Sequence, residues 1–154
     1  MHPNRPNLIA VRKLKESGLR PTRQRVALAR LLLETGPRHV TAEELFQEAR
    51  AAGIPVSLAT VYNTLHQFTA AGLMTEVVAG SGQSYFDTNP TSHYHYFDKS
   101  TGEIIDVPEE AIQFLRLPEP PPGKVIDRID VVVRIRSATN RTAAYRSGSE
   151  ADRD

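Results

Sequence analysis

Residues 57–72 read SLATVYNTLHQFTAAG, and this stretch predicts a helix with two different faces. Apolar residues recur in it at spacings of three and four, which places them on one stripe of a helix. They are Leu58, Val61, Leu65 and Phe68. Ser57 is a suitable N-cap, and Gly72 stands where a glycine commonly follows the end of a helix.

The opposite face of this predicted helix is polar, small and free of acidic residues. It carries Ala59, Thr60, Tyr62, Asn63, His66 and Gln67. Amide and hydroxyl groups can meet base edges in the major groove of DNA, and a tyrosine ring or an alanine can meet a thymine methyl. The face therefore predicts a DNA-reading helix, with an ordinary amphipathic surface helix as the alternative.

Composition bounds the remaining possibilities. The chain has 154 residues, enough for one domain or two small ones, and its 40% hydrophobic content can form a core. No apolar run approaches the roughly 20 residues of a membrane span, and the N-terminus has no apolar signal-peptide core. Cysteine is absent, which excludes disulfides and thiolate zinc sites. We expect a cytoplasmic protein without a membrane partner.

The net charge of +1 conceals an asymmetry. Residues 1–36 hold eight basic and two acidic side chains, whereas residues 37–136 hold eight basic and thirteen acidic ones. A basic block on an otherwise acidic chain indicates a surface that faces a polyanion. A solvated helix face is the alternative reading of the same block.

The order of elements before residue 72 predicts a helix-turn-helix. Residues 1–7 are expected to be frayed, and helices are expected over about 8–17 and 22–34. Thr41 and Glu44 form the pattern of a capping box, which opens a third helix that ends at Gly53. The polar-faced helix then follows, which is the position of a recognition helix.

Two short strands, 73–78 and 83–88, predict a hairpin that serves as a wing behind the reading helix. We therefore expect a winged helix-turn-helix DNA-binding domain over residues 1–88 and a hinge at 89–91. In this wing, Gly80, Ser81 and Gly82 supply no charge for a phosphate contact.

A second, small α/β domain is expected over residues 92–136, which makes the whole chain α+β. Its predicted elements are strands at 93–98 and 103–107, a short helix from Pro108, and a long strand over 125–135. Such a thin core would gain from pairing with a second copy, so a homodimer is expected. The polar residues 137–154 predict a disordered tail.

Candidate metal ligands gather where the two domains join. His93 and His95 lie two residues apart, and on a strand their side chains share one face. Asp87 ends the wing, and His39 is expected in a loop before the third helix. Nitrogen and carboxylate ligands without thiolate suit Mn²⁺, Fe²⁺ or Zn²⁺. Structural or surface histidines are the alternative.

The order of these segments resembles the ferric uptake regulator family, a family of dimeric, metal-dependent winged-helix transcription regulators. The segments are GLRPTRQRVALARLL, HVTAEELF, SLATVYNTLHQFTAAGLM, YFD and HYHYFD…GEIIDV, within residues 14–136. The missing cysteines and YFDTNPTSHYHYF look most like the iron response regulator branch. That resemblance implies control of iron and haem genes and a response to haem.

The resemblance also implies site residues. The family's sensory metal site matches His39, Asp87, His93 and His95, and Asp106 can complete the shell. The family's base-contacting tyrosine matches Tyr62, while the arginine that usually follows it is Asn63 here. Phosphate contacts would come from Lys15, Arg20, Arg23, Ser57 and Thr60.

Departures from the family pattern limit the cofactors. The structural zinc site needs two CxxC pairs, and the chain has no cysteine. A third metal site of the family lacks its ligands, because its positions hold Ser92, Tyr94, Gln113 and Ile129. One divalent metal site per chain is therefore expected. His93 and His95 offer axial ligation to haem as a second possibility.

Three further readings remain open from the sequence. The first is a plain manganese- or iron-dependent repressor of the same fold with no haem role. The second is a metal-dependent enzyme built on His93, His95 and Asp87, although no nucleophile–base pair or phosphate-cradling loop supports it. The third is an interaction domain that keeps the fold but does not bind DNA.

Overall fold

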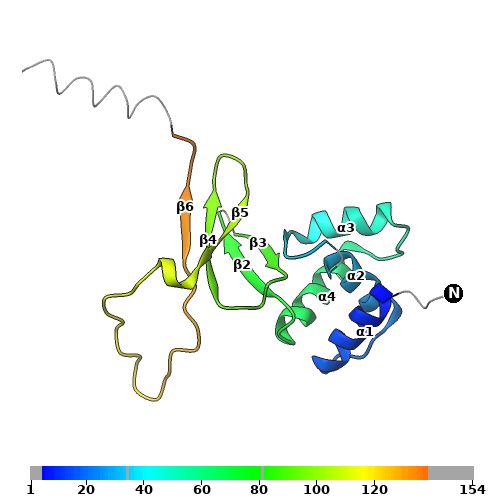
Figure 1. Cartoon of the computed structure of the whole chain (residues 1–154), viewed down its shortest axis with the longest axis horizontal. Coiled ribbons are helices and arrows are strands. Elements are labelled where there is room, and N and C mark those ends of the chain that lie inside the picture. The colour runs from blue at the N-terminus through cyan, green and yellow to red at the C-terminus, as the bar shows by residue number, and fades with distance from the viewer. Residues whose placement is uncertain (1–4, 34, 81, 139–154) are drawn as a thin grey trace, which may run out of the picture. The chain divides into compact units, whose positions relative to one another are not determined.

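The computed structural model describes residues 5–33, 35–80 and 82–138, and the chain divides into two compact units. Unit 1 spans Met1–Ser92 and unit 2 spans His93–Asp154. The described part of unit 1 holds four helices and a three-stranded sheet, and unit 2 holds a second three-stranded sheet (Figure 1). This combination confirms the expected α+β class.

Four helices of unit 1 pack around one hydrophobic core: α1 (Arg5–Glu16), α2 (Arg23–Leu33), α3 (Ala42–Ala51) and α4 (Leu58–Ala70). Each contributes fully buried apolar side chains, which include Leu14, Leu28, Leu45, Leu65 and Phe68. Since α1 begins at Arg5, the expectation of a frayed start is wrong for residues 5–7. Residues 1–4 lie outside the described part.

The two helices of the expected helix-turn-helix have the caps that the sequence predicts. Thr41 accepts the backbone N–H of Glu44, and the Glu44 carboxylate accepts that of Thr41, which completes the capping box of α3. Ser57 caps α4 by accepting the backbone N–H of Thr60. Gly72 follows the end of α4 with φ +80°, a left-handed conformation that favours glycine.

The first sheet has the strand order β1-β3-β2. β2 (Thr75–Ala79) and β3 (Gln83–Asp87) form the predicted antiparallel hairpin. β1 (His39–Val40) adds a third, two-residue strand on the other side of β3. This strand was not predicted, because two residues show no alternation and the pairing joins segments far apart in the sequence.

The second sheet has the order β5-β4-β6. β4 (His93–Asp98) pairs antiparallel with β5 (Ile104–Pro108) and parallel with β6 (Val132–Ile135). Alternation along β4 puts His93, His95 and Phe97 on one face and Tyr94 and Tyr96 on the other.

The predicted strand over 125–135 is wrong for residues 125–131. Of these residues only Val132–Ile135 form a strand, and its pairing with β4 starts at His95 opposite Val132. Val125 and Ile126 are exposed.

The predicted helix from Pro108 is also wrong. The structure has only a 3-10 turn, η1 (Glu109–Ala111). Phe114 and Leu115, which the prediction placed on the helix, are exposed. A helix of about eight residues has little stability without a surface that buries its apolar face.

Residues 139–154, most of the predicted disordered tail, lie outside the described part. Within the described residues, no helix combines the length and apolarity that crossing a bilayer requires.

Candidate functional site

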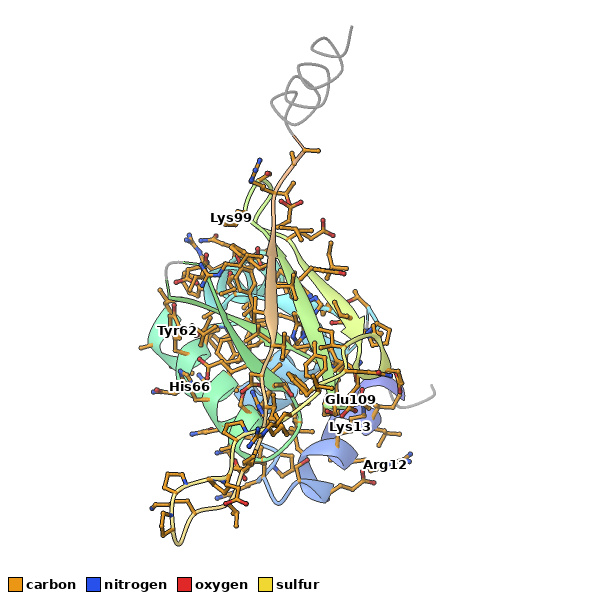
Figure 2. The ribbon with its side chains drawn as sticks, turned by 90° about the vertical axis from the view of Figure 1, so that its left-hand side faces the viewer. Arg12, Lys13, Tyr62, His66, Lys99 and Glu109 are labelled. Atoms are coloured by element: carbon orange, nitrogen blue, oxygen red, sulfur yellow. The ribbon has the colours of Figure 1, made fainter. Side chains whose placement is uncertain are left out.

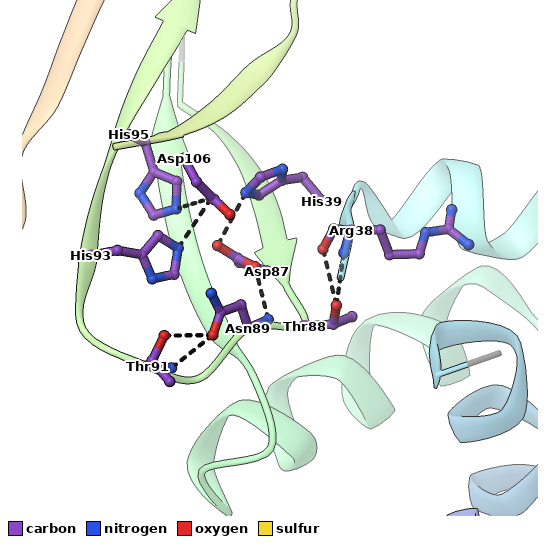
Figure 3. A network of polar contacts seen from close by, with 9 residues as sticks. All are labelled: Arg38, His39, Asp87, Thr88, Asn89, Thr91, His93, His95 and Asp106. Carbon is purple, nitrogen blue, oxygen red and sulfur yellow. Dashed lines mark hydrogen bonds and ion pairs between the residues drawn. The ribbon is translucent and has the colours of Figure 1, made fainter. Parts of the chain in front are cut away.

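The first pair of candidate ligands lies in unit 1 and links β1 to β3. His39 is the register partner of Asp87, and its Nε2 lies 3.0 Å from Asp87 Oδ2 (Figure 3). The expectation that His39 lies in a loop is therefore wrong. Pairing with a strand 48 residues later holds the imidazole against the carboxylate.

Contacts of Arg38, the residue directly before β1, fix the position of His39. The Arg38 guanidinium donates two hydrogen bonds to the Glu48 carboxylate, at 2.9 and 2.5 Å, and this contact raises the Arg38 pKa. The backbone N–H of Arg38 donates to the Thr88 hydroxyl at 2.9 Å, and the N–H of Thr88 donates to the Arg38 carbonyl at 3.0 Å. The strand is thus tied to α3 and to the residue after Asp87.

Asp87 is a buried carboxylate whose two oxygens both have partners. Its side chain is 1% exposed. Oδ2 faces His39, and Oδ1 accepts the backbone N–H of Asn89 at 2.9 Å. A carboxylate in such surroundings must be paired or ligate a cation, because burial of an isolated charge is costly. The contacts with His39 and with the Asn89 N–H meet this requirement and fix both oxygens of Asp87.

The second group of candidate ligands lies in unit 2, on one face of the β4–β5 pair. His95 is the register partner of Asp106, and His93 precedes it on the same face. Asp106 Oδ1 lies 3.1 Å from His93 Nε2 and 3.5 Å from His95 Nε2 (Figure 3). The two imidazole centres are 4.5 Å apart. Ligand atoms of all three residues lie within 4.8 Å of one another.

This donor chemistry fits a divalent transition metal. Two imidazoles and a carboxylate in unit 2, and one of each in unit 1, are ligands of the type that Mn²⁺, Fe²⁺ and Zn²⁺ accept. Tyr94 does not belong to the cluster, because it lies on the opposite face of β4 and packs edge-on against Phe114.

The predicted DNA-reading face of α4 is open to solvent. Its exposed residues include Ala59, Asn63, His66, Gln67 and Ala70. Ser57 and Thr60, which we expected to contact phosphates, also bond to each other through their hydroxyl oxygens at 2.9 Å. Asn63 is the exposed amide nearest the middle of the helix, the position that the sequence assigned to base readout.

Tyr62 on this face is held by contacts from two other residues. Its hydroxyl donates to Glu43 Oε1, on α3, at 2.6 Å, and this hydrogen bond raises the Tyr62 pKa. Its ring stacks on His66, one turn later, with centres 6.4 Å apart and planes at 20° (Figure 2). His66 in turn meets the ring of Phe86 in β3 edge-on.

A second side-chain link joins α2 to α4. Arg25 donates to Gln67 Oε1 through Nε and one terminal nitrogen, at 3.3 and 3.0 Å, and to the Arg20 carbonyl at 3.0 Å. Sequence reasoning missed both Arg25 and Glu43 as partners of the reading helix. No local signal marks them, because each contact joins two different helices.

The three cations that we expected to contact phosphates have exposed side chains. Lys15 lies near the end of α1, Arg20 lies between α1 and α2, and Arg23 begins α2. Arg12 and Lys13, also exposed, project from α1 (Figure 2). All five are cations of unit 1, the unit that also carries α4.

Comparisons with known proteins agree with this fold. The model of the ferric uptake regulator family matches residues 16–117. The peroxide-responsive repressor PerR of Staphylococcus aureus (strain Mu50) is 35% identical over 97 residues, which are 63% of this chain and 65% of the repressor. The chain thus spans slightly less than two thirds of the curated relatives it matches.

Solved structures of related regulators extend the similarity. The ferric uptake regulator of Pseudomonas aeruginosa, solved with manganese, superposes with a TM-score of 0.65 at 27% identity, over 85% of this chain and 99% of that one. The ferric uptake regulator of Vibrio cholerae superposes with a TM-score of 0.63 at 23% identity, over 82% and 98%, and supports the fold alone. Because the family model covers about two thirds of the sequence, this chain belongs to the ferric uptake regulator family.

Proposed function

We propose that this protein is a homodimeric transcription regulator that binds operator DNA in response to a divalent metal. The observation that carries the proposal is the pair of donor sets, His39 with Asp87 and His93, His95 with Asp106. In this proposal residues 1–88 form the DNA-binding domain, 89–91 the hinge and 92–136 the dimerisation domain. The protein acts in the cytoplasm and is not an enzyme.

All five ligands are proposed to serve one ion per chain. Only residues 88–92 separate Asp87 from His93, and a fully extended chain limits the distance between those two Cα atoms to about 20 Å. The two donor sets can therefore meet. A bound divalent ion would link the two units and set the angle between the DNA-binding domain and the dimerisation domain.

Manganese or ferrous iron is the proposed ion, with zinc as a further possibility. The donor set is nitrogen and oxygen only, which suits all three metals. The Pseudomonas aeruginosa regulator was solved with manganese, which supports the first. A structural zinc site of four cysteines is not part of the proposal, because the chain has no cysteine.

DNA contact is proposed to divide between readout and phosphate binding. Tyr62 and Asn63 on α4 would face base edges in the major groove, where an asparagine can pair with adenine through two hydrogen bonds. Lys15, Arg20 and Arg23 would contact phosphates, as would Ser57 and Thr60 at the start of α4. The exposed, acid-free face of α4 supports this division.

Selection from a random duplex DNA library tests the proposal. The wild-type protein with Mn²⁺ should enrich a pseudo-palindromic sequence, and the metal-free protein should enrich it far less. Asn63→Ala should abolish the enrichment, while Gln47→Ala, on the exposed side of α3, is the matched control. Equal enrichment with and without metal, or none in any condition, would contradict the proposal.

Control of iron and haem genes is the second candidate function, in line with the iron response regulator branch. The pair of strand histidines favours it, because imidazoles are common axial ligands of haem iron. In the structure both rings are nearly buried and face Asp106, so haem at His93 and His95 would compete with a divalent ion for the same nitrogens.

A haem titration of the metal-free protein, followed at the Soret band, tests this second candidate. Saturable binding that disappears in His93→Ala/His95→Ala and weakens with Mn²⁺ would support haem sensing at this site. Absence of saturable haem binding, or haem binding that is unchanged in His93→Ala/His95→Ala, would contradict haem sensing at this site and favour a repressor that responds to a divalent metal. The peroxide-responsive relatives are named for a third stimulus, so hydrogen peroxide belongs in the same series.

A further inference from the structure

The hydrogen bond between Tyr62 and Glu43 changes what the reading face offers to DNA. A tyrosine hydroxyl has one donor hydrogen and two acceptor lone pairs, whereas a carboxylate only accepts. The Tyr62 hydroxyl donates its one hydrogen to Glu43 Oε1 at 2.6 Å. The Tyr62 hydroxyl oxygen and the Glu43 carboxylate can therefore only accept further hydrogen bonds.

We propose that Glu43 is a specificity-determining residue that acts through Tyr62 and makes this part of α4 select a base with an exocyclic amino group. The inference rests on the proposed DNA-binding function and deepens it. In the major groove, adenine N6 and cytosine N4 are donors, while guanine O6 and thymine O4 are acceptors. A paired set of acceptors fits the first two bases and repels the last two.

A second contact, with the ring of His66, also fixes the Tyr62 ring. It stacks on His66, and His66 meets Phe86 edge-on with ring centres 5.6 Å apart. The phenol is therefore held between α3 and the wing before DNA arrives, and a preorganised contact loses less freedom on binding. An A·T pair suits this arrangement, since it presents a thymine methyl to the ring and adenine N6 to the acceptor oxygens.

Glu43 is separate from the neighbouring acid that supports the helix. Glu44 completes the capping box with Thr41, whereas Glu43 is exposed and reaches Tyr62 on the next helix. Removal of the Glu43 carboxylate therefore leaves the cap of α3 in place. A carboxylate close to DNA also repels phosphates, so the presence of Glu43 on α3 beside Tyr62 needs a compensating role, and orientation of Tyr62 supplies one.

The experiment is sequencing of the duplexes that each variant enriches from a random library in the presence of Mn²⁺. The set is wild type, Glu43→Ala, Tyr62→Phe, the double variant, and Glu16→Ala. Glu16 is an exposed carboxylate on α1 and controls for the change in charge. Circular dichroism of each variant checks that the fold is kept.

The expected result is a change at one position of each half-site. Wild type should prefer adenine or cytosine there, and Glu43→Ala should reduce that preference about three- to tenfold, the effect of one hydrogen bond. Tyr62→Phe should remove the preference, and adding Glu43→Ala to it should change nothing further. Glu16→Ala should raise affinity for all sequences alike.

Two results would overturn the inference. In the first, Glu43→Ala changes affinity by one factor for every sequence, as Glu16→Ala does. In the second, Glu43→Ala alters base preference equally with tyrosine or phenylalanine at position 62. Both leave the proposed DNA-binding function intact, whereas a wild-type protein that enriches no sequence would contradict that function and this inference with it.

Discussion

His39 and Asp87 face each other across β1 and β3, with 3.0 Å between Nε2 and Oδ2. The pair exists because a two-residue strand reaches the end of the wing, where Arg38 and Thr88 hold it in register. An imidazole and a buried carboxylate are thereby fixed side by side before any cation arrives. Unit 1, which carries α4, thus contributes two ligands, His39 and Asp87, to the proposed metal site.

Metal binding should stabilise the wild-type protein. An ion that binds only the folded state at a concentration of 100 times its dissociation constant raises the free energy of unfolding by about 2.7 kcal/mol. We expect this gain from Mn²⁺ in urea denaturation of wild type and its loss in His93→Ala/His95→Ala. Asp98→Asn, at the far end of β4, should keep the gain, and an equal gain in all three proteins would argue against these ligands.

A side chain at position 72 should lower the free energy of unfolding. Gly72→Ala places a Cβ in a left-handed conformation that costs about 1 kcal/mol or more. No atom beyond the adjacent residues lies within 4 Å of that Cβ, so the cost comes from the backbone conformation. Gly72→Asn should cost clearly less, because asparagine tolerates this region. Equal losses for both variants in chemical denaturation would contradict the explanation.

The capping box of α3 should contribute measurably to stability. Thr41→Ala removes the acceptor for the Glu44 N–H and should lower the free energy of unfolding by about 1 kcal/mol. Thr35→Ala, in the exposed turn after α2, is the matched control and should have little effect. A loss below about 0.3 kcal/mol for Thr41→Ala would show that the cap contributes little.

The phenol of Tyr62 should titrate above the usual tyrosine range. Glu43 accepts its hydrogen and raises its pKa, so Tyr62 stays protonated to higher pH than a free tyrosine. The difference between alkaline absorbance titrations of wild type and Tyr62→Phe isolates this group. Glu43→Ala should shift it to lower pH, and an unchanged titration would show that the hydrogen bond does not form in solution.

The sequence predicted those elements whose signals are local. Helix α4 follows from a periodic apolar stripe between a serine cap and a glycine stop, and α3 follows from its capping box. The wing follows from two short strands around a glycine turn. In each case the residues that decide the structure lie within a few positions of one another.

The sequence pattern does not predict contacts between segments that are far apart in the chain. β1 exists only because it pairs with β3, and the links from Arg25 to Gln67 and from Glu43 to Tyr62 span 42 and 19 residues. Residues 112–115 do not form the predicted helix, and residues 125–131 do not form the predicted strand, for a related reason. Their apolar residues match the patterns of a helix and a strand, yet Phe114, Leu115, Val125 and Ile126 are exposed in the structure.

The most direct test of the account is the stoichiometry of Mn²⁺ bound at equilibrium to wild type, Asp87→Asn and Asp106→Asn. We expect one ion per chain in wild type and at least a tenfold loss of affinity in each variant, because one ion uses ligands from both units. Full binding by either variant, or two ions per wild-type chain with each variant losing one, would contradict a single shared site.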